Sequence, residues 1–219
     1  MTFREVLAEI RKNEASAKRE KGTQFEKLIR LWLLNDPRYD FEKVYLWSDF
    51  PYRLDFGAGQ DIGIDLVAQD KSGEYWAIQC KCYAENGRIE KEDVDTFIGA
   101  SGKDFDNHSK KFSVRLFVST TANWSENAES EIKNQTPPVI RINIAELEES
   151  DVDWENLWKK VSGQEGIENL RKAKKKLHPH QEEAIQKAVE YYKDNDRGKL
   201  IMACGTGKTF TSLKVVERY

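Results

Sequence analysis

Hydrophobic residues in the first 35 positions recur at the spacing of α-helices. A first pattern begins at Val6, Leu7 and Ile10 and becomes highly charged as far as Lys21. A second pattern has the i, i+3, i+4, i+7, i+8 spacing that gives a helix one apolar face. Its apolar members are Phe25, Leu28, Ile29, Trp32 and Leu33.

The ends of this second helix are also marked. Thr23 stands where an N-cap is expected, Glu26 three residues later would complete a capping box, and Asp36-Pro37 follows the last apolar residue. We therefore predict a helix over about 23–35.

The middle of the chain alternates between strand and helix patterns. Runs rich in Val, Ile, Phe, Tyr and Trp predict strands at 43–47, 62–68, 74–82, 113–119 and 139–144, and helical spacing predicts helices at 91–101 and 125–133. The turn residues 70–73 indicate that the second and third strands form an antiparallel hairpin. Together, these strands and helices predict an α/β fold with a central mixed sheet flanked by helices.

Beyond residue 145 the pattern changes. An acidic stretch is followed by a basic run at 171–176, and Trp154, Leu157, Trp158 and Val161 give the segment between them an apolar helical face. This pattern indicates a structured linker that docks on a neighbour. We expect three parts: a first domain at 1–145, a helical linker at 146–176 and a further segment at 177–219.

Composition narrows the class of protein. The 219 residues are 39% hydrophobic and 33% charged, without an apolar run near the roughly 18 residues of a membrane span and without a signal peptide, so we expect a cytoplasmic protein. Cys80, Cys82 and Cys204 have neither disulfide nor zinc-site spacing, which favours free thiols. Because the net charge is -3, any contact with nucleic acid must come from local basic patches.

The predicted hairpin brings chemically reactive groups together. On its second strand, the period of two places Gln79 and Lys81 on one face and Ile78 and Cys80 on the other. Pairing brings Asp65 beside Ile78 and Gln79, with the register open by one residue. A carboxylate, an amide oxygen and an ammonium would then converge.

Such a trio suits phosphodiester hydrolysis. Mg²⁺ takes one or two protein oxygens and completes its octahedron with water and substrate phosphate, and Mn²⁺ can substitute for it. Asp65 would be the anionic ligand, and the side chain of Gln79 or the backbone carbonyl of Cys80 would supply another oxygen. Lys81 would orient the attacking water or stabilise charge on the phosphorane.

Three short motifs, at 22–26 (GTQFE), 63–65 (GID) and 79–81 (QCK), resemble the PD-(D/E)XK nucleases and in particular their Mrr-like branch. The resemblance spans about 22–144. It implies the restriction-endonuclease-like fold, with Glu26, Asp65, Gln79 and Lys81 as catalytic residues.

This segment departs from the superfamily at one position. Gln79 stands where most members have Asp or Glu, although the Mrr-like branch commonly has Gln-x-Lys, so the number of metal ions stays open. Asp61 either compensates for the missing charge or caps the turn after 57–59. Glu26 has the helix cap as an alternative role, and Lys81 taken alone would be an ordinary surface lysine.

A second motif lies near the C-terminus. A short apolar run at 199–204 precedes a loop and a helical stretch from Phe210, which is the strand, loop and helix order of a phosphate-binding P-loop. The loop residues are Gly205, Thr206, Gly207, Lys208 and Thr209. Backbone N–H groups would enclose the phosphates of ATP, Lys208 would reach the outer phosphates, and Thr209 would hold Mg²⁺. Met202 stands where the general pattern has its first glycine.

Together with Gln181 upstream, this loop resembles the adenine-reading glutamine motif and Walker A of superfamily 2 helicases. The amide of Gln181 offers both a donor and an acceptor to the adenine edge. Since the sequence ends ten residues after Thr209, we expect a truncated motor without ATPase activity.

A Mrr-like nuclease fused to such a motor resembles the type ISP single-chain restriction-modification enzymes. The resemblance implies double-stranded DNA as partner, translocation driven by ATP, no membrane, downstream motor, methyltransferase and target-recognition regions in the same polypeptide, and a second enzyme copy during cleavage. Three alternatives remain: a catalytically inactive DNA-binding or docking module, the nuclease of another defence helicase-nuclease, and a junction resolvase.

Overall fold

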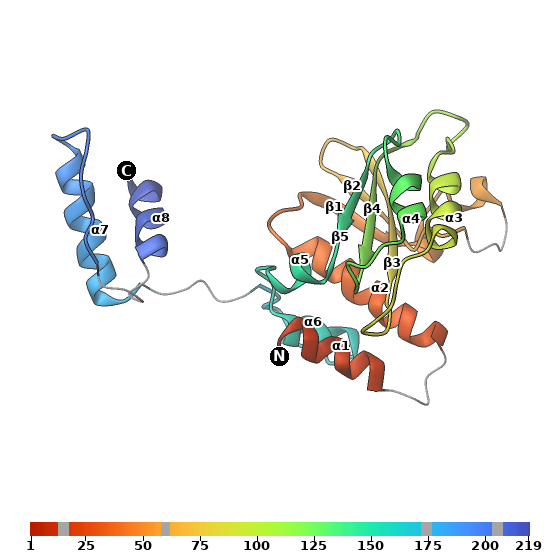
Figure 1. The fold of residues 1–219 in the computed structure, drawn as a ribbon, viewed down its shortest axis with the longest axis horizontal. Coiled ribbons are helices and arrows are strands. Elements are labelled where there is room, and N and C mark those ends of the chain that lie inside the picture. Colours follow the sequence, from red (N-terminus) through yellow and green to blue (C-terminus); the bar gives the residue numbers. More distant parts are fainter. Residues whose placement is uncertain (13–17, 58–61, 172–176, 203–207) are drawn as a thin grey trace. The chain divides into compact units, whose positions relative to one another are not determined.

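The computed structural model describes residues 1–12, 18–57, 62–171, 177–202 and 208–219 (Figure 1). The chain divides into two compact units, Met1–Lys172 and Ala173–Tyr219. Asp61, Cys204 and the loop residues Gly205, Thr206 and Gly207 lie outside the described residues, as do the side chains of Lys208 and Thr209.

A five-stranded mixed sheet forms the centre of the first unit. The strands are β1 (Phe41–Leu46), β2 (Leu66–Asp70), β3 (Tyr75–Lys81), β4 (Phe112–Ser119) and β5 (Val139–Ile142), and they lie in that order. β1, β2 and β3 pair antiparallel, whereas β3, β4 and β5 pair parallel. The predicted hairpin is confirmed, and its register places Leu66 opposite Ile78. The predicted α/β fold is confirmed with it.

Helices cover both faces of the sheet (Figure 1). On one side are α1 (Phe3–Lys12), α2 (Lys18–Asn35), α5 (Ile144–Glu148) and α6 (Trp154–Val161); on the other are α3 (Lys91–Ser101) and α4 (Glu126–Ile132). Two short 3₁₀ helices, η1 (Trp47–Asp49) and η2 (Arg53–Phe56), follow β1. Each face has its own apolar core, because alternate strand residues point to opposite sides.

The predicted linker helix is part of the first core. The rings of Phe3 in α1 and Trp154 in α6 lie 4.7 Å apart, and Leu157 is fully buried. The indole N–H of Trp32 in α2 donates to Ser150 Oγ at 2.7 Å. α6 therefore closes the layer that contains α1 and α2.

Two predicted boundaries were wrong near the candidate site. α2 begins at Lys18, so Thr23 lies inside the helix and donates its hydroxyl to the carbonyl of Arg19 at 3.1 Å; it is not an N-cap. The strand predicted from 62 begins only at Leu66, because Gly63 has a φ of +75°, which is incompatible with extended backbone.

The second unit contains two helices among its described residues, α7 (Pro179–Tyr192) and α8 (Lys208–Arg218), which are joined by an ion pair between Arg218 and Glu182 at 2.5 Å. The predicted strand was wrong over 199–202, which have no strand pairing. An isolated strand leaves its backbone groups without partners, and the described part of this unit offers no neighbouring strand. Of the helices described in either unit, none has the length and apolar character needed to cross a membrane.

Candidate active site

Asp65 lies immediately before β2, and its backbone and side chain are both tied to β3. Its N–H donates to the carbonyl of Ile78 at 2.9 Å, and its Oδ2 accepts the N–H of Cys80 at 2.6 Å. The half-buried carboxylate is therefore held at the C-terminal end of β3. This resolves the open register: Asp65 lies beside Gln79 and Cys80.

Gln79 is the most informative side chain of the group. It is only 3% exposed, and its Oε1 is buried with no hydrogen-bond partner among the described residues. A Cβ at Gly63 would lie 3.2 Å from Gln79 Nε2 and 3.0 Å from the backbone nitrogen of Phe97, so only glycine leaves room for this amide. An unpaired buried acceptor is costly, which indicates a site built for a ligand.

Lys81 follows on the same face of β3, as predicted. It is half-buried, and its Nζ lies 3.8 Å from Asp93 Oδ1 at the start of α3. This distance is long for a hydrogen bond, so the ammonium is held near the strand end by charge attraction.

Cys80 and Glu26 approach from the opposite face. Burial, followed by the charges of Asp65 and Glu26, raises the pKa of the Cys80 thiol well above its usual value. The thiol therefore stays protonated at neutral pH, and the backbone carbonyl is the group that Cys80 can offer to a cation. Glu26 is half-buried on α2, close enough for its carboxylate to act on Cys80.

The donor set fits a hard divalent cation. Asp65 offers a carboxylate, Gln79 a buried amide oxygen and Cys80 a backbone carbonyl, and all three are oxygen ligands of the kind that Mg²⁺ prefers. Across the described ranges there is no group of three or more His, Cys, Asp or Glu that could hold a metal ion.

The structure adds residues to this site that the sequence patterns did not reveal. Asp93 lies beside Lys81, and Arg11 in α1 donates to the carbonyl of Tyr83 at 2.5 Å. Arg11 Nε is buried without a hydrogen-bond partner in the described part of the chain, as is Gln79 Oε1. Both atoms lie close to the end of β3. Their distant positions in the sequence carry no signal of this proximity.

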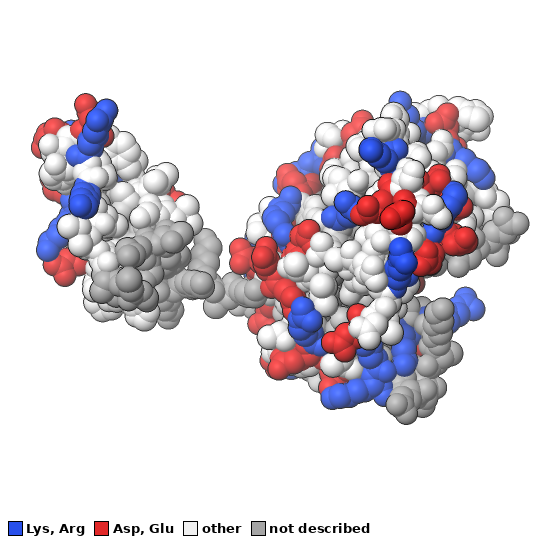
Figure 2. All heavy atoms as spheres, viewed as in Figure 1, with Lys and Arg blue, Asp and Glu red and all other residues white. Residues whose placement is uncertain are grey.

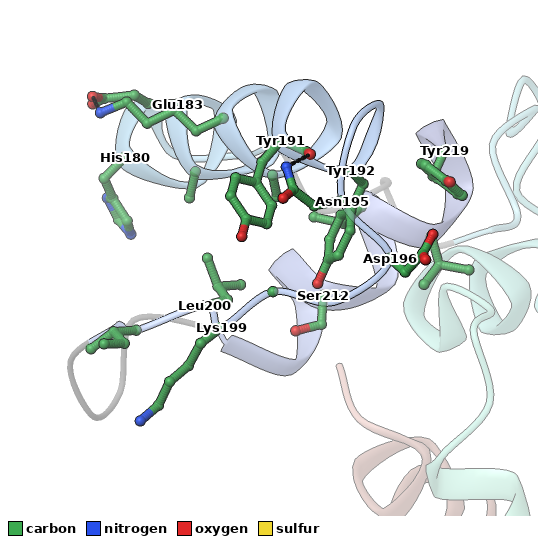
Figure 3. Close-up of a pocket in the computed structure, with 17 residues that line it drawn as sticks. His180, Glu183, Tyr191, Tyr192, Asn195, Asp196, Lys199, Leu200, Ser212 and Tyr219 are labelled. Carbon is green, nitrogen blue, oxygen red and sulfur yellow. Dashed lines mark hydrogen bonds and ion pairs between the residues drawn. The ribbon is translucent and has the colours of Figure 1, made fainter.

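In the second unit, Gln181 is buried and belongs to a helix cap. Its Oε1 accepts the N–H of His178 at 3.0 Å at the start of α7. A separate open groove is lined by α7, α8 and residues 195–201, with Tyr191, Tyr192 and Leu200 along it (Figure 3). Gln181 does not line this groove.

Comparisons with known proteins agree with both units. A family model described as restriction endonuclease matches residues 34–164, and one described as type III restriction enzyme, res subunit, matches residues 174–219. A search of curated proteins found no match.

Among solved structures, the ATP-dependent type ISP restriction-modification enzyme LlaBIII bound to DNA is similar over 100% of this chain, with 32% identity and a TM-score of 0.69. This chain covers 13% of that protein. The DNA modification-dependent restriction endonuclease AspBHI aligns over 73% of this chain and 34% of its own, with 16% identity and a TM-score of 0.40. Because the restriction endonuclease model matches more than half of the residues, the chain belongs to the restriction endonuclease family, with a helicase-related segment after it.

Proposed function

We propose that the first unit hydrolyses phosphodiester bonds of double-stranded DNA with a divalent cation held by Asp65, Gln79 and the carbonyl of Cys80. The observation that carries this proposal is the buried Oε1 of Gln79, which has no hydrogen-bond partner among the described residues and lies beside the aspartate held by the N–H of Cys80. A purely structural glutamine at this depth would have a hydrogen-bond partner.

Each residue then has a distinct task. A bound Mg²⁺ or Mn²⁺ would lower the pKa of a coordinated water and screen the charge of the phosphate. Asp65 supplies the anionic ligand and is kept in place by the N–H of Cys80. Lys81, attracted by Asp93, directs its ammonium toward the attacked phosphate and stabilises developing negative charge. Glu26 adds a carboxylate from α2, since the capping role considered for it does not apply.

Cleavage of plasmid DNA in Mg²⁺ or Mn²⁺ tests the proposal. Asp65→Asn and Lys81→Met should each lower the cleavage rate by on the order of 100-fold or more, because each removes charge needed at the transition state. Asp95→Asn is a matched control, since Asp95 lies on α3 two residues beyond Asp93 but pairs with Lys91 at 2.7 Å. Equal residual cleavage in both site variants and the control would contradict the assignment.

A catalytically inactive DNA-binding module is the second candidate, and the amide at position 79 is the observation that favours it. The same assay distinguishes the two. If a folded wild-type chain binds DNA without cutting it in either cation, the inactive module is supported.

The second unit supports a further part of the proposal. We infer that residues 205–209 bind the phosphates of ATP in a motor that moves on double-stranded DNA, as the similarity to an ATP-dependent enzyme suggests. Methyltransferase and target-recognition regions in the same polypeptide, and a second copy during cleavage, belong to this proposal too. A Lys208→Ala change in a chain that contains the whole motor should abolish ATP turnover.

A further inference from the structure

Positive charge is concentrated in one segment of an otherwise acidic chain. Residues 11–30 contain seven Lys and Arg and three Glu, a net charge of +4, whereas the whole chain has a net charge of -3. Lys and Arg side chains gather where α1 ends and α2 begins (Figure 2). We call the described members of this group, Arg11, Lys12, Arg19 and Lys21, the basic surface.

The basic surface is fixed to the strand that carries the candidate site. Arg11 Nη2 donates to the carbonyl of Tyr83, two residues beyond Lys81, and Lys21 Nζ donates to the carbonyl of Arg11 at 3.0 Å. The charges of Arg11 and Lys21 also act on the Cys82 thiol, which lies directly after Lys81. These cations therefore border the C-terminal end of β3.

The charges of this surface are largely uncompensated. Lys12 pairs with Glu9 at 2.8 Å, but Arg11, Arg19 and Lys21 have no carboxylate partner within the described residues. Arg11 also keeps a buried Nε without an acceptor there. Arg11 and Lys21 donate to backbone carbonyls and not to carboxylates, so their charges remain able to bind an anion.

The opposite side of the site has the opposite charge. Acidic side chains gather over α3 and α4 (Figure 2). Two of the basic residues there are already paired: Lys91 contacts Asp95 and Glu131 at 2.7 and 2.6 Å, and Arg88 lies 3.7 Å from Glu90. A polyanion that reaches Lys81 is therefore repelled from α3 and attracted toward α1 and α2.

We propose that the basic surface binds the phosphate backbone of duplex DNA and directs one strand across the end of β3 to the candidate site. The inference rests on the proposed DNA cleavage, which it deepens by assigning the approach side of the substrate. Contacts of this kind position the duplex without reading its sequence.

DNA binding, measured without the divalent cation that cleavage would need, tests the inference. A fluorescently labelled DNA duplex is titrated with the full 219-residue chain in EDTA at several salt concentrations, and anisotropy is measured. Arg19→Gln/Lys21→Gln should weaken binding on the order of tenfold and lower the slope of log K against log salt by about 2, because two phosphate contacts are lost. The matched control is Lys103→Gln/Lys133→Gln, two exposed lysines without ion pairs in the described structure.

The binding of the two double variants either supports or overturns the inference. Weaker DNA binding only in Arg19→Gln/Lys21→Gln supports the inference. An unchanged salt slope in that variant, equally weakened binding in both double variants, or no binding by wild type overturns it. If Lys21→Gln unfolds the chain, the exposed single change Arg19→Glu replaces the pair, with Lys103→Glu as its control. Binding through the basic surface by a chain that never cuts in Mg²⁺ or Mn²⁺ would keep this inference and remove the proposed nuclease activity.

Discussion

The change Gln79→Met separates stability from activity at the candidate site. Methionine keeps the length of the side chain but removes the buried Oε1 that has no partner among the described residues. An unsatisfied buried acceptor costs about 1–3 kcal/mol, and an imperfect fit of the thioether costs about 1 kcal/mol. We expect the variant to be about 1 kcal/mol more stable than wild type without metal, and to lose cleavage.

Tryptophan fluorescence measures this change selectively. All six tryptophans lie within residues 1–172, so unfolding followed by their emission monitors the first unit alone. A gain of about 1 kcal/mol corresponds to a midpoint higher by roughly 2–4 °C for a domain of this size. Added Mg²⁺ should raise the wild-type midpoint and leave the variant nearly unchanged, because a ligand stabilises only the state that binds it.

A matched control is available on the neighbouring strand. Gln69 is half-exposed at the end of β2, with its Nε2 3.5 Å from the carbonyl of Gly73. Gln69→Met should change stability by less than about 0.5 kcal/mol. A Gln79→Met protein less stable than wild type by more than about 1 kcal/mol in metal-free buffer would refute the reasoning, since Oε1 would then contribute to the fold.

Three further predictions concern the scaffold. Burial alone would raise the pKa of Asp36, but hydrogen bonds from Arg38 and Ser150 lower it below its usual value. The stabilising effect of this carboxylate is therefore present at neutral pH and is lost in acid, as the pH falls through the lowered pKa. Asp36→Asn should cost about 2 kcal/mol at pH 7 and flatten the acid limb of a stability–pH curve. Arg115→Met should cost about 2–4 kcal/mol in denaturant titrations, since one buried and two partly buried acceptors lose their donor. Arg141→Met, which breaks an exposed ion pair, should cost under about 0.5 kcal/mol. A fragment ending at residue 145 should lack a cooperative melt by circular dichroism, because it loses five buried apolar side chains worth roughly 7–15 kcal/mol in total. A cooperative melt near the wild-type midpoint would show that α6 is dispensable.

The sequence predicted the parts of the site that depend on local periodicity. Alternation along β3 placed Gln79 and Lys81 on one face, and the turn at 70–73 predicted the hairpin that brings Asp65 to them. The capping box at Thr23 was wrong because residues 18–21 are good helix formers and the helix continues through Gly22, and local pattern cannot distinguish a cap from a continued helix.

Contacts between distant segments could not be predicted in this way. Asp93 reaches Lys81 only because the crossover between the parallel strands β3 and β4 returns α3 over the sheet, and Arg11 reaches Tyr83 across more than seventy residues. The strand predicted at 199–202 failed for a related reason, since a strand depends on neighbours that its own sequence does not specify.

The contact between α1 and α6 has a consequence for the timing of synthesis. Phe3 emerges from the ribosome first, yet the ring it packs against, Trp154, follows about 150 residues later. Domains fold as units during translation, so α1 and α2 remain without their covering helix until α6 has been made. The first unit would thus acquire its final packing only after α6, which ends at Val161, has been synthesised.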